Sequence, residues 1–446
     1  MKTPIVDFVK RYASSDVSRF HMPGHKGKSF LGCEALDITE IDGADVLYSA
    51  CGIIEESEEN TSSLFRTAPT YFSAEGSSLC IKAMLGIVKS ASEKERPLIL
   101  AARNAHKAFI YAAALLDLDV KWLFPKACTH LCACPVTAED VRTAIENGER
   151  KPDAVYLTSP DYLGGIQDIE GIASVCKAYG IPLLVDNAHG AYLAFLEESR
   201  HPIALGASMC CDSAHKTLPV LTGGAYLHIA EGAPEAYMAQ ARTMLSLFAS
   251  TSPSYLILQS LDLCNAYLAG GYREKLADCI MKADAIKKTL SENGIPVLES
   301  EPLKLVLDAN TIGYTGEEIA EYLRKKKIEI EFSDRELAVF MFTPENDGRD
   351  FERLKDALTE LPKYGAKNGR PNLPMPRART ACSVREAVFS PKKKVRVTEA
   401  EGLVCASPLV SCPPAVPIVM SGEVITEEAV AWFSYYGTEY VEVIAK

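Results

Sequence analysis

The sequence predicts an α/β protein with a mostly parallel sheet in its larger domain. Between about residues 70 and 230, short apolar runs alternate with amphipathic segments, which is the pattern of successive strand–helix–strand units. The chain has 446 residues, of which 48% are hydrophobic, and it contains no apolar run long enough to cross a membrane. A chain of this length and composition is typical of a globular protein with two or more structural units.

Several segments of the larger domain have the composition of buried strands. Helices are expected between them, because Ile172, Val175 and Cys176 fall on one face of residues 169–179 and a second apolar face follows Ser78. The expected strands are Pro97–Ala102, Val120–Phe124, Asp153–Thr158, Ile181–Val185 and Gly223–Ile229.

A smaller α/β domain is expected next, with strands over 302–308 and 337–342 beside a helix over 316–326. The Pro-, Gly- and Lys-rich stretch 363–379 predicts a linker to a terminal unit, in which the run Lys392–Lys394 is expected to be a solvated turn. The predicted organisation is an N-terminal segment, a large cofactor-binding domain, a small α/β domain and a C-terminal domain, over residues 1–50, 51–285, 286–365 and 366–446.

Charge and cysteine content limit the class of protein. The net charge of −12 disfavours nucleic acid as a main partner, because a polyanion would be repelled. The N-terminus lacks the basic and apolar regions of a signal peptide, so a cytoplasmic location and 14 reduced thiols are expected. Cys128, His130, Cys132 and Cys134 could ligate zinc, but their spacing is tighter than the usual pairs, and an irregular surface loop without a metal is favoured.

The segment Val185–His189 follows a predicted parallel strand, at the edge where open α/β sheets bind their ligands. Asp186 could hold a cationic ring nitrogen there, and His189 could project into the same cleft. The alternative is a loop cap or a metal pair.

Lys216 lies thirty residues after Asp186, in the segment Ser213–Pro219 before a returning strand. This setting fits a lysine that binds an aldehyde covalently, which requires an amine activated by burial or by a neighbouring cation. One alternative is a surface charge. Another is a serine acylase with the Ser213-x-x-Lys216 spacing, whose companion motifs are absent.

The segment Glu75–Ser78 opens a predicted helix, so its free N–H groups and the hydroxyls of Ser77 and Ser78 could bind a phosphate. The alternative is an ordinary serine cap. His106 follows another strand and could stack on an aromatic ring. A phosphate cradle, a stacking ring, an acid for a ring nitrogen and a lysine occur in the chain order expected of a fold type I pyridoxal-phosphate (PLP) enzyme.

Longer motifs make the resemblance specific. The chain is similar to the ornithine/lysine/arginine decarboxylases from residue 21 to residue 423, which implies a fold type I PLP enzyme, aspartate-aminotransferase-like, with an extra C-terminal α+β domain. The motifs that carry the resemblance are His21–Gly27, Thr158–Gly164, Asp186–Gly190, Ser213–Pro219, Ser250–Tyr255, Pro413–Pro417 and Gly422–Glu423.

The resemblance also implies the roles of individual residues. Lys216 would hold the PLP aldehyde, Asp186 would keep the ring nitrogen protonated, and His189 would lie near the phenolic oxygen. His106 would stack on the ring, and Lys216 or His215 would return a proton to the substrate. The phosphate would be bound by Ser77, Ser78, Ser213 and His215, together with Ser250 or Thr251 of a neighbouring subunit. This implies a homodimer with shared active sites.

The implied reaction is decarboxylation of a basic amino acid to an amine and CO2, in polyamine biosynthesis. Arginine, lysine and ornithine are the candidate substrates, with a slight preference for arginine, because short family members without a receiver-like N-terminal domain are often arginine decarboxylases. An acidic residue must pair with the distal cation of such a substrate, and Glu423 and Asp161 are the candidates.

Three positions depart from the family pattern and leave the choice of substrate open. Asn187 stands where an acid is usual, Asp161 where Thr or Asn is common, and Ala415 where the terminal motif has Gly. The alternatives are an aminotransferase, in which Arg335 would bind the substrate carboxylate, a β-lyase, or a silent PLP-binding regulatory protein.

Overall fold

The structure is a computed structural model that describes residues 1–126, 130, 132–366, 376–408 and 416–445. Contacts within the chain divide it into two compact units, and the last of the boundaries between them falls inside one long helix, α10 (Tyr272–Glu292). The expected domain boundaries at residues 50, 285 and 365 stay a prediction. The first unit comprises Met1–Ala101, Thr137–Ser159 and Asp168–Arg273, and the second comprises Ala102–Val136, Pro160–Gln167 and Glu274–Lys446.

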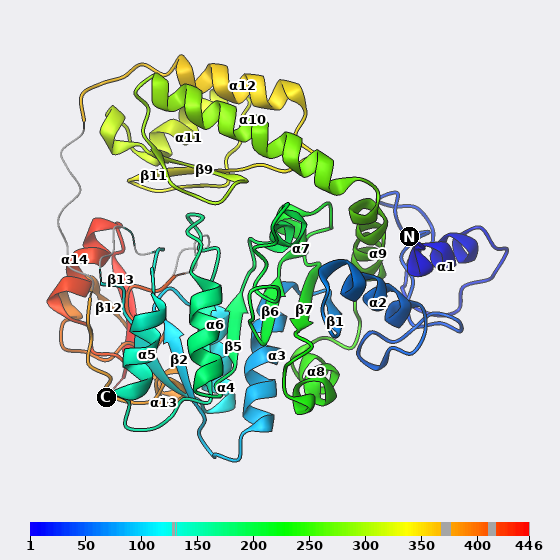
Figure 1. Ribbon diagram of the computed structural model, residues 1–446, viewed down its shortest axis with the longest axis horizontal. Coiled ribbons are helices and arrows are strands. Elements are labelled where there is room, and N and C mark those ends of the chain that lie inside the picture. The colour runs from blue at the N-terminus through cyan, green and yellow to red at the C-terminus, as the bar shows by residue number, and fades with distance from the viewer. Residues whose placement is uncertain (127–129, 131, 367–375, 409–415, 446) are drawn as a thin grey trace. The chain divides into compact units, whose positions relative to one another are not determined.

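A seven-stranded sheet (Figure 1) lies mostly in the first unit, whereas its edge strand β3 falls among the residues of the second; the strand order is β1-β7-β6-β5-β4-β2-β3. Strands β2, β4, β5 and β6 run parallel, whereas β7 is antiparallel to both β6 and β1. The carboxyl ends of the parallel strands therefore meet at one edge. The strands are β1 (Thr70–Ser73), β2 (Leu98–Ala102), β3 (Asp119–Leu123), β4 (Ala154–Thr158), β5 (Leu183–Asp186), β6 (Met209–Asp212) and β7 (Ala225–Ile229).

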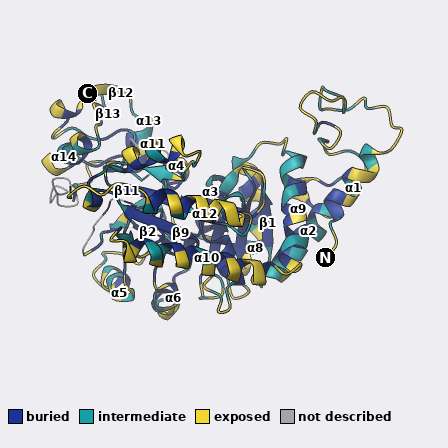
Figure 2. Ribbon diagram, turned by 90° about the horizontal axis from the view of Figure 1, so that it is seen from above, coloured by how far each residue is buried: buried dark blue, intermediate teal, exposed yellow. Residues whose placement is uncertain are grey.

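The expected strands of the larger domain are confirmed to within two residues. Strands β2, β4, β5 and β7 are apolar segments buried in the sheet, whereas the edge strand β3 is buried only at Leu123. The helix expected after Ser78 begins earlier, at Gly76. Figure 2 shows α3 on one side of these strands and α5 and α6 on the other. The remaining elements of the first unit are α1 (Pro4–Ala13), η1 (Leu47–Ser49), α2 (Ile53–Phe65), α3 (Gly76–Ala91), α5 (Ala138–Glu146), α6 (Ile169–Ala178), η2 (Ala191–Phe195), α7 (Ala214–Thr217), α8 (Glu235–Phe248) and α9 (Tyr255–Ala269).

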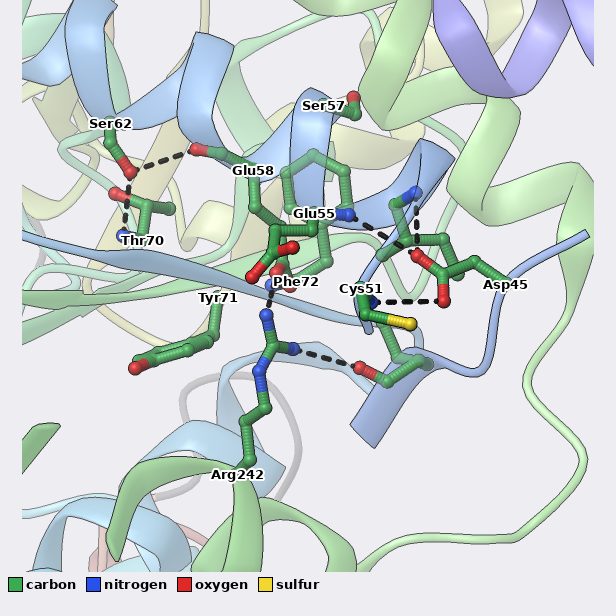
Figure 3. A network of polar contacts seen from close by, with 12 residues as sticks. Asp45, Cys51, Glu55, Ser57, Glu58, Ser62, Thr70, Tyr71, Phe72 and Arg242 are labelled. Carbon is green, nitrogen blue, oxygen red and sulfur yellow. Dashed lines mark hydrogen bonds and ion pairs between the residues drawn. The ribbon is translucent and has the colours of Figure 1, made fainter. Parts of the chain in front are cut away.

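A buried polar network joins α2, β1 and α8 (Figure 3). Arg242 of α8 donates to Glu58 Oε2 of α2 at 2.7 Å, and the Phe72 amide of β1 donates to Glu58 Oε1 at 2.8 Å. Arg242 also donates to the Leu47 carbonyl at 3.0 Å. Burial raises the pKa of Glu58 to about 7, although Arg242 acts in the opposite direction. This network fixes α8, whose end leads into the loop that carries Ser250.

The second unit contains a four-stranded sheet in the order β10-β11-β9-β8. Thr315 and Asp347 begin helices α11 and α12 with reciprocal capping hydrogen bonds, which satisfy amides that have no partner within the helix. The elements are α4 (Lys107–Leu116), β8 (Val297–Leu298), β9 (Lys304–Asp308), η3 (Asn310–Ile312), α11 (Gly316–Lys325), β10 (Phe332–Ser333), β11 (Leu337–Met341), α12 (Gly348–Thr359), α13 (Val384–Phe389), β12 (Lys392–Arg396), η4 (Val397–Glu399), α14 (Glu427–Tyr435) and β13 (Tyr440–Ile444).

The lysine run 392–394 corrects one expectation. It is exposed, as predicted, but it lies in strand β12, which pairs antiparallel with β13. Pairing with an apolar partner strand outweighs the low strand propensity of lysine. Across the described residues, no helix is both long and apolar enough to cross a bilayer.

Candidate active site

The predicted site residues of the first unit gather where β5 and β6 end. Asp186 is the last residue of β5, and its register partner in parallel strand β6 is Cys211, so Ser213 begins the next turn beside it. The short helix α7 then carries His215 and Lys216. Parallel pairing thus brings together residues that lie about thirty positions apart in the chain.

Asp186 is buried and held by three donors. The Tyr156 hydroxyl donates to Oδ2 at 3.3 Å, while the Ala188 amide and the Cys211 thiol donate to Oδ1 at 3.2 and 3.7 Å. Burial, and then the charge of Asp186, raise the pKa of Tyr156 well above its ordinary value, so its hydroxyl remains a donor. The carboxylate is oriented before any ligand binds.

Lys216 and His189 face each other across the two turns. Nζ of Lys216 lies 3.0 Å from Nε2 of His189, and the lysine is only partly buried. Two groups that can exchange a proton therefore lie within hydrogen-bond distance of each other, at the sheet edge where Asp186 ends β5. Their predicted roles toward PLP stay a prediction.

The residues of the predicted phosphate cradle lie at the beginning of α3. Gly76 has a φ of +70°, which favours glycine, and a Cβ there would lie 4.0 Å from the nearest atom, Cε1 of His215. The Ser213 hydroxyl donates to the Ser77 hydroxyl at 2.8 Å, so two of the predicted phosphate-binding side chains are in contact. Ser78 follows in the first helical turn, where amides lack helical partners.

His215 lies at the same cradle. Its Nδ1 donates to the Gly224 carbonyl at 2.9 Å. Burial lowers the pKa of His215, and the charge of Lys216 lowers it further. The ring is therefore held in its neutral form, in which Nδ1 carries the proton and Nε2 does not.

Ser250 approaches this region within the same chain. Its amide donates at 2.7 Å to Oε1 of Glu75, the residue before α3. Ser250 and Thr251 are both exposed. Their contribution to the site of a second subunit stays a prediction.

His106 belongs to the second unit, where its Nδ1 accepts a hydrogen bond from the Ala108 amide at 3.1 Å and caps α4. Its stacking on a cofactor ring stays a prediction.

The two predicted substrate acids are buried in the second unit and already accept hydrogen bonds. Asp161 Oδ1 accepts from the amides of Leu163 and Gly165, both at 2.9 Å. Burial raises the pKa of Asp161 to about 6, against the effect of the turn amides and of Lys304. A substrate cation at Asp161 would share the carboxylate with this turn.

Glu423 is paired with a buried arginine. Its Oε2 accepts from Arg103 Nη2 at 2.9 Å and from the Met420 amide at 2.8 Å. Burial raises the pKa of Glu423, and Arg103 opposes this effect. Its role in binding substrate stays a prediction, as does that of Asp161. Arg335, the residue that an aminotransferase would need, is exposed and donates to the Tyr435 carbonyl.

Sequence reasoning missed Asp212, a buried carboxylate with three side-chain donors. Asn187 Nδ2 donates to its Oδ1 at 2.6 Å, and His201 and His228 contact its Oδ2 at 3.1 and 3.2 Å. Burial acts to raise the pKa of Asp212, but the two histidines outweigh burial and hold the pKa below its ordinary value. The side chain of Asn187, where the family usually has an acid, thus donates to a carboxylate that Asp212 supplies. The only signal in the sequence was the position of Asp212 directly before Ser213.

The cysteine cluster and the terminal motif lie partly outside the described residues. Cys128 and Ala415 are not described, whereas His130 Nδ1 lies 3.1 Å from Glu336 Oε2, and Cys132 and Cys134 are buried. Within the described ranges, His201, Cys210 and Asp212 are the group whose atoms lie close enough together for a metal, but their donors already bond to one another.

Comparisons with known proteins identify the family of the chain. Residues 3–302 match the family described as Orn/Lys/Arg decarboxylase, major domain, and residues 367–440 match its C-terminal domain. The chain is 28% identical to an arginine decarboxylase of Bacillus subtilis, over 97% of this chain and 93% of the relative. It is 29% identical to the arginine decarboxylase of Halalkalibacterium halodurans, over 97% and 92% of the two chains.

A solved structure shows the same architecture. The lysine decarboxylase LdcF of Francisella novicida superposes with a TM-score of 0.83 at 18% identity, over 99% of this chain and 81% of that one. The predicted fold, a fold type I α/β architecture with a small domain and a C-terminal domain, is confirmed.

Proposed function

Because the chain belongs to the Orn/Lys/Arg decarboxylase family of PLP-dependent amino-acid decarboxylases, we propose that it converts a basic amino acid, arginine first, to the amine and CO2 with PLP bound at Lys216. The observation that carries this proposal is the convergence of Asp186, His189 and Lys216 where β5 and β6 end.

The residues present fit PLP. Gly76 leaves open space beside His215, and the hydroxyls of Ser77 and Ser213 line the beginning of α3, where amides and the helix dipole favour a phosphate. The Asp186 carboxylate, already oriented by Tyr156, would hold the ring nitrogen. Lys216 would bind the aldehyde. When bound, PLP supplies an electron sink for the negative charge that remains on Cα as CO2 leaves.

The chain's own groups manage position and protons. Asp186 would favour the charged form of the ring nitrogen through a hydrogen bond and its negative charge. His189 lies 3.0 Å from Lys216 Nζ, so it would keep the amine in place beside the substrate. Lys216 Nζ would deliver the one proton that replaces CO2 on Cα. His215 could deliver it only after its Nε2 gains a proton, because in the neutral ring Nδ1 holds the one N–H and donates it to Gly224.

Arginine is favoured because the similar Bacillus subtilis and Halalkalibacterium halodurans proteins carry the name arginine decarboxylase. The product would then be agmatine, a precursor for polyamine synthesis. Asp161 and Glu423 are the proposed partners of the substrate's distal cation, and His106 is the proposed stacking ring. Ser250 and Thr251 act across a homodimer in the cytoplasm.

The test is product analysis of the PLP-loaded protein offered arginine, lysine and ornithine separately. We expect one amine, formed in equal amount with CO2, and no keto acid. Lys216→Ala should abolish turnover and the absorbance band of covalently bound PLP. Lys82→Ala, on the surface of α3, is the control and should leave both unchanged. Keto acid in place of amine, or a Lys216-dependent band without any amine, would refute the proposal.

A further inference from the structure

A buried hydrogen bond links the two turns that carry the predicted PLP residues. Asn187 Nδ2 donates to Asp212 Oδ1 at 2.6 Å, and both side chains are fully buried. Asn187 directly follows Asp186, and Asp212 directly precedes Ser213. The bond therefore joins the end of β5 to the end of β6 at the point where the site begins.

Asp212 also connects this point to the neighbouring strands. Its Oδ2 contacts Nε2 of His228 in β7 at 3.2 Å and Nε2 of His201 at 3.1 Å. His228 Nδ1 lies 2.7 Å from the Thr70 hydroxyl of β1. One carboxylate thus contacts side chains from β7 and from the turn after β5, and through His228 it reaches β1.

The direction of the bond follows from the chemistry of its members. An amide nitrogen can only donate, and an ionised carboxylate can only accept, so the negative charge lies on β6 among three N–H donors. Burial lowers the pKa of His228, which keeps this ring neutral, with a donor at Nε2 and an acceptor at Nδ1 for Thr70. Each nitrogen that faces the carboxylate thus has a partner, whereas Asn187 Oδ1 and His201 Nδ1 are buried without a hydrogen bond.

The bridge does not use the groups that would contact PLP. Side chains alternate between the two faces of a sheet, so the neighbours Asn187 and Asp212 lie on the face opposite Asp186 and Cys211. The separate partners of Asp186, which are Tyr156, Ala188 and Cys211, agree with this alternation. Asp212 can therefore act on the site only by positioning its neighbours.

We propose that Asp212 is a positioning residue that, through its bond to Asn187, sets the spacing between the Asp186–His189 turn and the Ser213–Lys216 turn. This inference rests on the proposed binding of PLP. It predicts that loss of the bridge weakens PLP binding in a chain that is still folded.

The experiment is a double-mutant cycle on PLP affinity, with Asp212→Asn, Asn187→Asp and the exchanged pair N187D/D212N. Each single change should weaken PLP binding by about tenfold or more. Asn187→Asp places two carboxylates 2.6 Å apart, and Asp212→Asn turns an N–H donor toward the ring nitrogens of His201 and His228. The exchanged pair restores one donor and one acceptor, so it should bind PLP about tenfold more tightly than the weaker single variant. Affinity is measured by absorbance titration at a temperature where circular dichroism shows every variant folded.

Asp262→Asn is the matched control. Asp262 is a buried carboxylate of the same unit, but it bonds to the Val6 amide and the Ser57 hydroxyl rather than to a predicted site residue. The Asp262→Asn variant should lose thermal stability and keep the PLP affinity of the wild type. If Asp212→Asn does not fold, Asn187→Ala removes the donor alone and should still weaken PLP binding.

Two failures can be told apart. Wild-type protein that binds no PLP contradicts the proposed function. Wild-type protein that binds PLP, with Asp212→Asn or Asn187→Ala binding it as tightly as Asp262→Asn does, contradicts the positioning role. So does an exchanged pair that binds no better than the singles.

Discussion

Asp186 illustrates how single residues are prepared for catalysis in this protein. Three donors fix its carboxylate. One of them, the Tyr156 hydroxyl, stays protonated because burial raises the pKa of that tyrosine. A carboxylate that is already oriented does not have to be ordered when a ligand arrives, so less binding free energy is lost.

Gly190 is required by the side chain of Asn187. A Cβ at residue 190 would lie 2.0 Å from Asn187 Oδ1 and 2.8 Å from Leu193 Cδ1, in a fully buried turn. Gly190→Ala should therefore lower the free energy of unfolding by about 1–3 kcal/mol. Gly232→Ala is the control, since a Cβ there meets nothing within 4 Å. Equal melting temperatures for the two variants would contradict the predicted clash.

Comparing protein stability with enzyme kinetics can decide whether Glu423 binds substrate or only pairs with Arg103. Glu423→Gln leaves the buried Arg103 without its ion pair, so it should lower the free energy of unfolding by about 3–5 kcal/mol. Replacing both residues, as in Arg103→Met with Glu423→Leu, should lower the free energy of unfolding by less, because no buried charge is left unpaired. Urea unfolding measures both variants. A folded, fully stable Glu423→Gln protein with a raised KM would instead favour direct contact with substrate.

At this scale the sequence predicted which side chains meet, but not what orients them. Asp186, Lys216, Ser213 and Ser77 were predicted because each has a chemical role at the end of a strand or the start of a helix. Tyr156 and Asp212 were missed because their contacts depend on which strands are neighbours and on which face each side chain lies. Strand order is not written in local sequence.

At the scale of elements, buried apolar segments were predictable and exposed ones were not. Strands β2, β4 and β5 were expected, because a short run of apolar residues between turns is stable when it is buried as a strand. Strand β12 begins with three lysines, and only its partner β13 explains it. The helix α3 begins at Gly76 rather than after Ser78, since Gly76 can adopt the positive φ from which the helix starts.

The network between α2 and α8 should make stability depend on pH. The pKa of Glu58 is raised from 4.5 to about 7 in the folded protein, so the folded state binds a proton that the unfolded state has lost between these values. The free energy of unfolding should therefore rise as the pH falls from 8 to 5. Glu58→Gln binds no such proton and should show a weaker pH dependence.

Urea unfolding of both proteins at pH 5, 6 and 8 checks this expectation, and Glu59→Gln on the same helix is the control. Parallel pH profiles for wild type and Glu58→Gln would show that burial does not raise the pKa of Glu58. Figure 3 shows how closely Arg242 and the Phe72 backbone approach this carboxylate.

For the whole molecule, the predicted site residues are divided between the two compact units. Lys216, Asp186 and the cradle belong to the first, whereas His106, Asp161 and Glu423 belong to the second. The residues of the first group could be predicted to lie together, because they all follow strands that end at the same edge of the sheet or begin the helix beside it. The roles of the second group rest on family motifs, since no local pattern connects them to the cradle.

PLP should stabilise the folded protein by mass action. At a free concentration one hundred times its Kd, it should raise the free energy of unfolding by about 2.7 kcal/mol. Pyridoxal, which lacks the phosphate, should give a smaller shift at the same concentration, because it cannot use the cradle of Ser77, Ser78 and Ser213. Thermal unfolding measures both ligands. Equal shifts would show that the start of α3 does not bind the phosphate.

The cysteines of this chain have a practical consequence. Cys80, Cys210, Cys211 and Cys264 are buried, and burial raises the pKa of Cys80 and of Cys264 to about 12. Thiolates, not thiols, react with alkylating reagents, so these side chains are protected twice, by access and by protonation. Cys51 is exposed and is open to the reagent. Pulsed alkylation would thus label exposed thiols at once and buried thiols only when the region around them unfolds. The labelling rate of each buried cysteine would therefore report the local unfolding of its region.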